Sequence, residues 1–482
     1  MLNVRLIFFV TGALLAILSA LMLIPAAVDL YSGSSDWTAF FLSSFLTAFV
    51  GIGLALSNKG FTGDIQVRDA FVLTCLSWGA ISVFAAMPLT FSEFRLSWAD
   101  AVFEAVSGLT TTGSTVIIGL DHSPPGVLLW RALLEGLGGI GIIVFALAVL
   151  PLLKIGGMQL FRTESSEKSD NVMPHSGQLA FAIGAVFIFL SLLCALCLWA
   201  AGMTPFDAIC HALGAVATGG FSNKDASLGY YNNPAFEAII ITFMLLGGMP
   251  FVLYIKALNG KASSLLKDVQ VRTFLLIALG SSLALTMWLY FHENVSFLTA
   301  LRHASFNAVS ILTTTGFVSQ DYGLWGGFAV VWFFFLSAFG GCTGSTTGGI
   351  KTFRFYLLWQ IAWVQIVHLV QPHAVMQPRF NGKNVSDAVC YSVMGFVIFY
   401  GATFMFFSIA LSALGLDFVT SLSAVTAALG NVGPGLGAIV GPAGTFAPLP
   451  DAAKWMLSFT MLLGRLEIFT ILALFSPRFW RV

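Results

Sequence analysis

Long apolar segments separated by short polar ones run along nearly the whole chain. Ten of them are long enough to cross about 30 Å of hydrocarbon as a helix. Their approximate bounds are 5–26, 38–57, 70–91, 126–152, 178–202, 234–256, 273–292, 324–370, 385–414 and 452–476, and the eighth is interrupted by glycines. The pattern therefore predicts an all-helical integral membrane protein with ten spanning helices.

Four shorter, half-polar stretches lie between the spans, and we expect short helices there that do not cross the bilayer. They lie near residues 98–110, 204–217, 298–313 and 417–429. Each ends at a glycine-bearing stretch: Thr110–Ser114, Ala217–Ser222, Thr313–Phe317 and Gly430–Gly435. Aligned on Gly113, Gly220, Gly316 and Gly433, these stretches recur at intervals of roughly 100 residues.

This recurrence predicts a two-helix N-terminal extension, residues 1–65, followed by four copies of one unit. Each unit contains a spanning helix, a short helix, a glycine turn and a second spanning helix. The expected units are 66–175, 176–270, 271–383 and 384–482. Because the sequences of the copies are only weakly similar, the repeat is inferred mainly from the order of elements.

Composition supports the membrane assignment and excludes other classes. Hydrophobic residues make up 57% of the chain and charged residues 9%, with a mean hydropathy of +0.90, whereas a soluble domain has about 25% charged residues. The net charge is zero and no basic block is present, so we expect no nucleic-acid partner. Cys194 and Cys197 form a Cys-x-x-Cys motif without the second pair that a zinc site needs, so buried cysteines are the simpler interpretation.

Lysine and arginine residues predict the orientation in the membrane. With the N-terminus inside, fourteen of the 22 fall in cytoplasmic segments and four in external ones, which places both termini in the cytoplasm. The first apolar run is longer than a signal-peptide core. We therefore interpret it as a membrane helix, although Ala26 and Ala27 would be a weak cleavage site under the alternative.

The glycine turns have the chemistry of a cation filter. Non-helical backbone at membrane depth lines a water-filled cavity or is buried, glycine permits dihedral angles that direct carbonyls toward one axis, and threonine hydroxyls can act as ligands or tie the turns together. The candidate filter residues are Thr111, Thr112, Gly113, Thr218, Gly219, Gly220, Thr314, Thr315, Gly316, Asn431, Val432 and Gly433. Four unrelated helix caps are the alternative, but it does not account for four equivalent positions around a pseudo-fourfold axis.

The interrupted span predicts a gate. Five glycines between Phe339 and Lys351 will not hold a helix, and a flexible loop in the inner half of the pore could open and close it. The candidate gate residues in this loop are Gly344, Ser345, Thr346, Thr347, Gly348, Gly349 and Lys351. A phosphate-binding loop is the alternative, but such a loop should follow a strand of a soluble fold.

Arg465 in the last span is the second candidate for the gate. A charge near the middle of the membrane costs at least roughly 2.5–3.5 kcal/mol, and it normally faces water or a partner. Apolar residues extend on both sides of Arg465, so its side chain is not expected to reach the interface. We expect it to project into the inner pore and repel cations, with Glu467 paired to Lys351 or Arg354.

Other charged residues have more than one interpretation. Arg131 and Glu135 lie one helical turn apart and are predicted to form a structural ion pair. His211 is a candidate for proton coupling or an ordinary packing histidine. The outer acids Asp207, Asp321, Asp417 and Asp451 could concentrate cations at the mouth, and helix capping accounts equally well for Asp207 and Asp417.

The four glycine turns, the break at Gly340–Lys351 and the segment Gly464–Glu467 together resemble the Trk/Ktr/HKT superfamily of potassium-translocating membrane subunits. The two-helix extension is similar to that of the bacterial Trk branch. Glycine in all four turns resembles potassium-preferring members, because serine in the first turn marks sodium-preferring relatives. A departure is Glu135–Gly136, where this resemblance would lead us to expect glutamine and a large aromatic residue.

The resemblance implies a homodimer with one pore per subunit, a cytoplasmic ring of nucleotide-binding regulatory subunits, and the bacterial inner membrane as the location. It also implies that the loop at Gly344–Gly349, with Arg465, obstructs permeation below the filter. We therefore expect potassium uptake through a gated, channel-like pore, with K⁺ as the transported ion and no covalent cofactor.

Two other functions remain open from the sequence. A proton- or sodium-coupled potassium symporter would need a titratable group in the permeation path, and His211 and Glu467 are the candidates. An integral-membrane transferase would need clustered acids or histidines, whereas the 22 acidic residues are dispersed. The expectation is that the protein is a transporter and not an enzyme.

Overall fold

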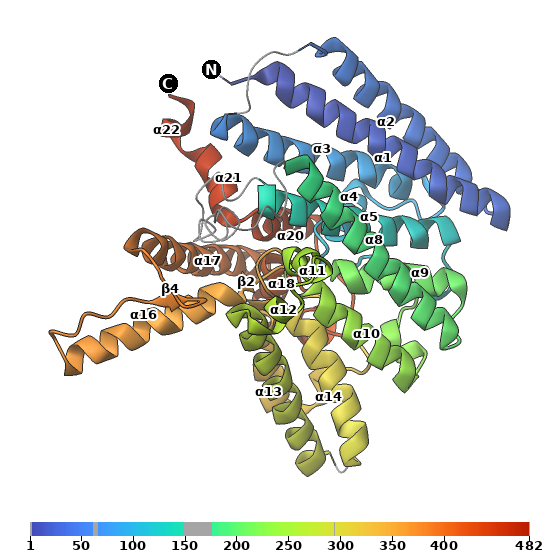
Figure 1. Ribbon diagram of the computed structural model, residues 1–482. Helices are drawn as coiled ribbons and strands as arrows, with labels where there is room; N and C mark the ends of the chain where they lie inside the picture. The colour runs from blue at the N-terminus through green and yellow to red at the C-terminus, as the bar shows by residue number, and fades with distance from the viewer. Residues whose placement is uncertain (1, 61–65, 149–175, 294, 482) are drawn as a thin grey trace.

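The computed structural model describes residues 2–60, 66–148, 176–293 and 295–481, and these residues are almost entirely helical (Figure 1). Eight helices are long and apolar enough to cross a membrane. They are α1 (Val4–Ser32), α2 (Trp37–Ser57), α3 (Val67–Phe91), α5 (Pro125–Ala148), α8 (Ser176–Ala200), α13 (Val269–His292), α16 (Thr352–Val370) and α17 (Asp387–Ala413). Each lies within a predicted span or overlaps most of one.

Two predicted spans are bent helix pairs, not the continuous helices that we expected. α10 (Pro234–Gly247) meets α11 (Phe251–Leu258) at 92°, and α20 (Asp451–Arg465) meets α21 (Ile468–Phe475) at 110°. Pro250 has no amide hydrogen to continue the first helix, and Glu467 has a φ of +63° at the second break. Counting each pair as one span gives ten, as predicted.

All four short helices form close to their predicted positions. They are α4 (Trp98–Leu109), α9 (Pro205–Ala217), α14 (Phe297–Leu312) and α18 (Phe418–Gly430). Each starts at a side chain that accepts a hydrogen bond from an amide of the first turn: Ser97, Thr204, Ser296 and Asp417. Such caps satisfy amides that a helix leaves unpaired. Asp417 is therefore a cap, whereas Asp207 lies in the first turn of α9.

The remaining elements are short. They are η1 (Leu120–His122), η2 (Ser227–Tyr230), η3 (Tyr322–Leu324), α12 (Ser263–Lys267), α15 (Gly326–Leu336), α19 (Gly437–Val440), α22 (Pro477–Trp480) and two pairs of two-residue strands. β1 (Phe339–Gly340) runs parallel to β2 (Ile350–Lys351), and β3 (Arg379–Phe380) runs antiparallel to β4 (Lys383–Asn384). The first pair closes the glycine-rich loop that was predicted to interrupt the eighth span.

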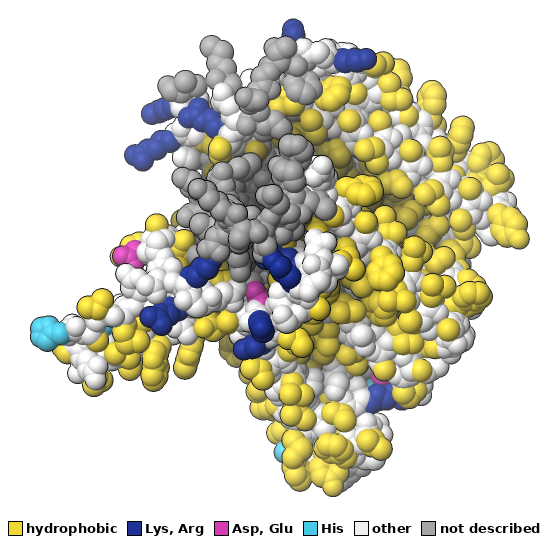
Figure 2. Space-filling model, in the orientation of Figure 1, with side chains coloured by type: hydrophobic (Ala, Val, Ile, Leu, Met, Phe, Trp, Pro, Cys, Tyr) yellow, Lys and Arg dark blue, Asp and Glu magenta, His cyan; other side chains and the backbone are white. Residues whose placement is uncertain are grey.

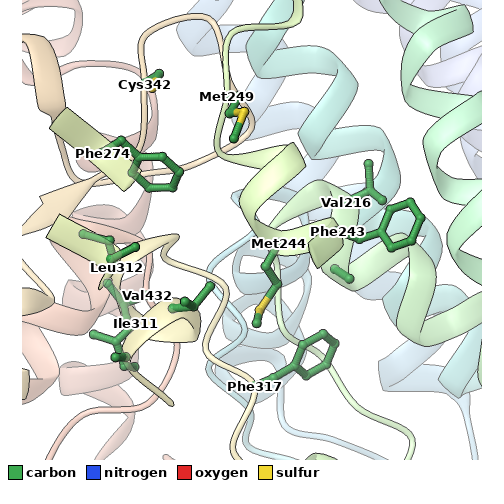
Figure 3. Packing of buried hydrophobic residues seen from close by; sticks show 14 of the residues in the cluster. Val216, Phe243, Met244, Met249, Phe274, Ile311, Leu312, Phe317, Cys342 and Val432 are labelled. Atoms are coloured by element: carbon green, nitrogen blue, oxygen red, sulfur yellow. The ribbon is translucent and has the colours of Figure 1, made fainter. Parts of the chain in front are cut away.

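Two apolar clusters hold the helices together. One contains residues from the helices between α8 and α16, including Phe251, Phe274 and Phe317. The other contains residues from the helices between α1 and α5 and from the C-terminal unit, including Trp130. Figure 3 shows part of the first cluster, where Met244 of α10 points toward Phe317. Figure 2 shows hydrophobic side chains covering much of the outer surface as well, as expected for helices whose solvent is lipid.

The N-terminal pair α1 and α2 packs side by side along its length (Figure 1). A Cβ atom built on Gly51 would lie 2.8 Å from the Ala16 nitrogen and 2.9 Å from the Gly12 oxygen. The two backbones therefore meet at small residues, which is the usual way for membrane helices to approach closely.

Gly51→Val should therefore force α1 and α2 apart, because the added methyl groups have no space. We expect a loss of about 1–3 kcal/mol in stability, the usual cost of overpacking, measured by thermal unfolding in detergent. Gly53→Val is the matched control, since a Cβ on Gly53 of the same helix meets nothing within 4 Å. Equal melting temperatures for the two variants would contradict this packing.

Candidate cation pore

The four glycine turns share one backbone conformation. The residue two positions before each aligned glycine has a left-handed φ: 50° at Thr111, 51° at Thr218, 55° at Thr314 and 52° at Asn431. The glycines follow with φ of 84°, 84°, 86° and 102°. Because residues other than glycine seldom adopt such angles, their recurrence identifies the turns as equivalent. Asn431 occupies the threonine position of the fourth turn, as predicted.

The turns also form a closed ring. Each aligned glycine lies against the carbonyl of the residue that precedes the glycine of a neighbouring turn. A Cβ built on the glycine would reach that oxygen at the following distances: Gly113 to Gly219, 2.2 Å; Gly220 to Thr315, 1.8 Å; Gly316 to Val432, 2.2 Å; Gly433 to Thr112, 2.7 Å. No side chain fits at these four places. The four glycines line a shared hollow of about 70 Å³.

Threonine hydroxyls brace the first and third turns internally, and one of them also joins the first turn to the fourth. Thr110 and Thr112 share a hydrogen bond of 2.7 Å between their hydroxyls, and Thr313 and Thr315 repeat it at 2.7 Å. In the fourth turn, the Asn431 amide donates to the Thr112 hydroxyl at 3.0 Å. These bonds favour the tying role over the ligand role for the hydroxyls involved.

A second equivalent position ties each turn to its own short helix. Nine residues before the glycine, the first three units have Glu104, His211 and Asn307. The three tethers are Thr115 Oγ1 to Glu104 Oε1 (2.9 Å), His211 Nε2 to Ser222 Oγ (3.0 Å) and Asn307 Nδ2 to Ser319 Oγ (3.0 Å). The fourth unit has Ala424 there, and Ser423 bonds the Leu436 carbonyl at 3.1 Å instead. The equivalent spacing can be counted in the sequence, whereas the bonds to the turns are seen only in the structure.

The glycine-rich loop lies directly against three of the turns. The Thr218 hydroxyl of the second turn donates to Thr346 Oγ1 at 3.1 Å. The Gly348 amide donates to the Thr314 hydroxyl at 2.7 Å, and a Cβ on Gly348 would lie 2.4 Å from the Gly430 oxygen. The loop is thus buried by the turns themselves, and the predicted break in the eighth span is confirmed.

Arg465 lies beside the loop in a small cavity of about 20 Å³. The cavity is also lined by Gly344, Ser345, Thr347, Gly348, Gly349, Lys351 and Glu467. Arg465 is 3% exposed, and among the described residues none bonds its three guanidinium nitrogens. Lys351 donates to the Thr347 carbonyl. The side chains of two basic residues therefore share the space next to the loop.

Glu467 pairs with Arg354, one of its two predicted partners. Arg354 Nη2 donates to Glu467 Oε2 at 2.7 Å, and the guanidinium lies 3.6 Å from the centre of the Phe396 ring. The pair joins the start of α16, directly after the loop, to the break between α20 and α21. The sequence narrowed the partner of Glu467 to Lys351 or Arg354, and the fold decided between them.

The predicted ion pair between Arg131 and Glu135 is wrong. Arg131 Nε instead donates to Glu104 Oε1 at 2.8 Å, and its Nη1 donates to the Ser222 carbonyl at 2.8 Å. Glu135 accepts from the Phe221 amide at 2.7 Å. One-turn spacing brings two side chains near each other, but here each finds a partner on another element.

His211 is buried and fully engaged. Its Nδ1 lies 2.8 Å from the Asp207 carbonyl and its Nε2 lies 3.0 Å from the Ser222 hydroxyl, while its ring packs against Tyr231 and Phe317. These contacts match the packing interpretation. The six cysteines are all free, and the described residues contain no cluster of three metal-ligating side chains.

Four short helices that direct equivalent turns to one axis, inside a shell of apolar spans, define a four-repeat membrane protein of the cation-transport class. The chain belongs to the TrkH family, described as cation transport protein, whose profile matches residues 37–482.

Curated relatives match over the full length. The chain is 44% identical over 473 residues to the Trk system potassium uptake protein TrkI of Halomonas elongata, covering 98% of this chain and 96% of that one. It is 37% identical over 482 residues to the Trk system potassium uptake protein TrkH of Escherichia coli K12, covering 99% of each. The crystal structure of the potassium transporter TrkH from Vibrio parahaemolyticus matches with a TM-score of 0.92 and 37% identity, over 100% of both chains.

Arg354→Met tests the buried ion pair, because it leaves the Glu467 carboxylate without this partner. Breaking such a pair costs about 3–5 kcal/mol, so we expect a large fall in the thermal unfolding midpoint in detergent. Lys224→Met is the control, since the Lys224 pair with Asp121 is partly exposed and 3.7 Å long. A fall no larger than that of the control would show that the pair does not stabilise the break.

Proposed function

We propose that this protein takes up K⁺ across the bacterial inner membrane through a gated, channel-like pore. The closed ring of four glycine turns is the observation that carries the proposal, because it gathers backbone carbonyls at four-fold related places around one hollow. Such carbonyl oxygens can replace the hydration shell of a cation. The relatives' names, Trk system potassium uptake proteins, support K⁺ as the ion.

In this proposal the filter consists of the twelve residues predicted from the sequence, three in each turn. The short helices end at the turns, so the negative ends of their dipoles favour a cation at the centre. Val432 and Gly433 continue the fourth turn after Asn431, and this turn contains no threonine. The filter is therefore only approximately fourfold, which limits its discrimination between cations.

The gate in this proposal is the loop of residues 344–349 with Lys351 and Arg465. The loop contacts the second, third and fourth turns, and Arg465 places a buried positive charge next to it. Opening requires the loop to leave these contacts. Three of the six residues in this loop are glycines, whose backbone adopts many conformations, so such a rearrangement is possible.

Passive conduction is favoured over ion coupling. Both titratable candidates are engaged in bonds within the fold, His211 with Ser222 and Glu467 with Arg354. A coupled symporter would need one of them in the permeation path. Uptake is then driven by the electrochemical gradient of K⁺, and no group transfer or cofactor is involved.

The proposed assembly is a homodimer with a cytoplasmic ring of nucleotide-binding regulatory subunits. The words "Trk system" in the relatives' names support action within a complex. Both chain ends lie on the same side of the molecule (Figure 1), which agrees with an even number of spans and cytoplasmic termini. In this proposal the four units have the bounds expected from the sequence, 66–175, 176–270, 271–383 and 384–482.

Gly113→Ser and Gly316→Ser test the filter. Each adds a Cβ that would lie 2.2 Å from a carbonyl oxygen of the next turn, so the ring must widen and hold K⁺ less well. We expect the K⁺ to Na⁺ flux ratio in proteoliposomes to fall at least about tenfold, or 1.4 kcal/mol. Gly119→Ser is the control, because Gly119 also has a positive φ of 83° but a Cβ there meets nothing within 4 Å. Unchanged selectivity in both filter variants would refute the assignment.

Arg465→Ala tests the gate, together with deletion of residues 344–348. Removing the positive charge or the obstruction should raise K⁺ flux in the absence of any regulatory subunit. Repulsion by one partly desolvated charge can amount to several kcal/mol, so we expect an increase of about tenfold or more. Lower flux from variants that elute and melt like the parent protein would count against the gate.

A further inference from the structure

Glu135 was predicted to pair with Arg131, but Arg131 bonds Glu104 instead. A different role for Glu135 follows from its position. It lies on α5 and is fully buried, with 0% exposure. Its Oε1 accepts a hydrogen bond of 2.7 Å from the amide of Phe221. Phe221 directly follows Gly220, the aligned glycine of the second turn, so a side chain from the first unit holds the backbone of the second.

This bond fixes the orientation of a filter carbonyl. The Gly220 carbonyl and the Phe221 amide belong to one planar peptide group, in which they point in opposite directions. Because the amide points toward Glu135 on α5, the Gly220 carbonyl points away from α5. Gly220 lines the hollow between the four turns, whereas Glu135 is not part of its lining. The carboxylate therefore acts from behind the turn.

The surroundings of Glu135 are shaped to fit its carboxyl group. A Cβ on Gly219 would lie 2.4 Å from Glu135 Cδ, and a Cβ on Gly214 would lie 2.9 Å from Glu135 Oε2. Gly219 belongs to the second turn and Gly214 to α9, so the carboxyl group is inserted between the short helix and its own turn. Removing it would leave a gap directly behind the filter backbone.

The two carboxylate oxygens differ in their contacts. Oε2 is buried and has no hydrogen-bond partner among the described residues. The nearest cation on the same helix, Arg131, is bonded to Glu104 and to the Ser222 carbonyl. Holding the turn therefore requires only one acceptor, Oε1. A glutamine side chain would keep this acceptor, and the amide nitrogen in place of Oε2 would break no hydrogen bond.

The geometry points to Glu135 as a positioning residue that determines cation selectivity, because it aims the Gly220 carbonyl into the filter. This inference rests on the proposed function, in which the four turns form the filter. Glu135 does not line the hollow between the turns, so it acts through the peptide group that joins Gly220 to Phe221. The second turn is held in this way by the first unit, whereas the fourth turn has Pro434, without an amide hydrogen, at the position of Phe221.

Two substitutions separate the acceptor from the charge. Glu135→Gln keeps an acceptor oxygen at the same reach, while Glu135→Leu has a similar volume and no acceptor. We expect the K⁺ to Na⁺ flux ratio of Glu135→Leu in proteoliposomes to fall at least about tenfold, with Na⁺ flux retained. Glu135→Gln should stay within about threefold of the parent protein. Retained Na⁺ flux shows that the variant is folded and open, so the loss cannot come from unfolding.

Glu237→Leu is the matched control, because Glu237 is also buried but its carboxylate accepts hydrogen bonds from Arg302 of α14 and not from a turn amide. A parental flux ratio in Glu135→Leu would overturn the inference, and so would a Glu135→Gln variant as unselective as Glu135→Leu. The proposed function fails separately, if Gly113→Ser and Gly316→Ser leave the ratio unchanged. Selectivity lost in those two variants but kept in Glu135→Leu would refute only the role of Glu135.

Discussion

The close approach of four backbones around one axis is the constraint on which the rest of the structure depends. At each turn a glycine lies against a carbonyl of its neighbour, at a distance that leaves no space for a Cβ atom. Contacts of this kind require the turns to arrive with the same dihedral angles and at the same depth. The capped short helices supply this, because each begins at a bonded N-terminus and leads into a turn with a left-handed residue two positions before its glycine.

The four units reach the same geometry with different chemistry. A carboxylate, an imidazole and an amide occupy the position that ties turn to helix in the first three units, and a neighbouring serine replaces them in the fourth. Hydrogen-bonding capacity is what these side chains share. Weak sequence similarity between the units is the expected result, because the backbone arrangement constrains the bonds and not the residue types.

Buried charges in this protein are mostly paired, as burial of a charge requires. Glu104 with Arg131 joins two helices of the first unit, and Glu467 with Arg354 joins the third unit to the fourth. Arg465 differs, because its guanidinium is buried in a small cavity beside the glycine-rich loop. A charge kept in that position at such a cost is consistent with the role in the pore that we propose for it.

The amino-acid sequence by itself determined the helices, the four equivalent turns and the broken span. Apolar length, helix caps and glycine positions are local signals, and local backbone preferences act on them directly. The sequence also placed Asn431 at the position in the fourth turn that threonine occupies in the other three turns. The tertiary structure decided which side chains meet: Arg131 with Glu104 and not Glu135, Glu467 with Arg354, and Glu135 with the Phe221 amide. Two spans that were predicted from the sequence to be continuous helices are bent in the structure. The side-chain pairings depend on contacts between elements that are separated in the chain, where sequence spacing carries no information about distance.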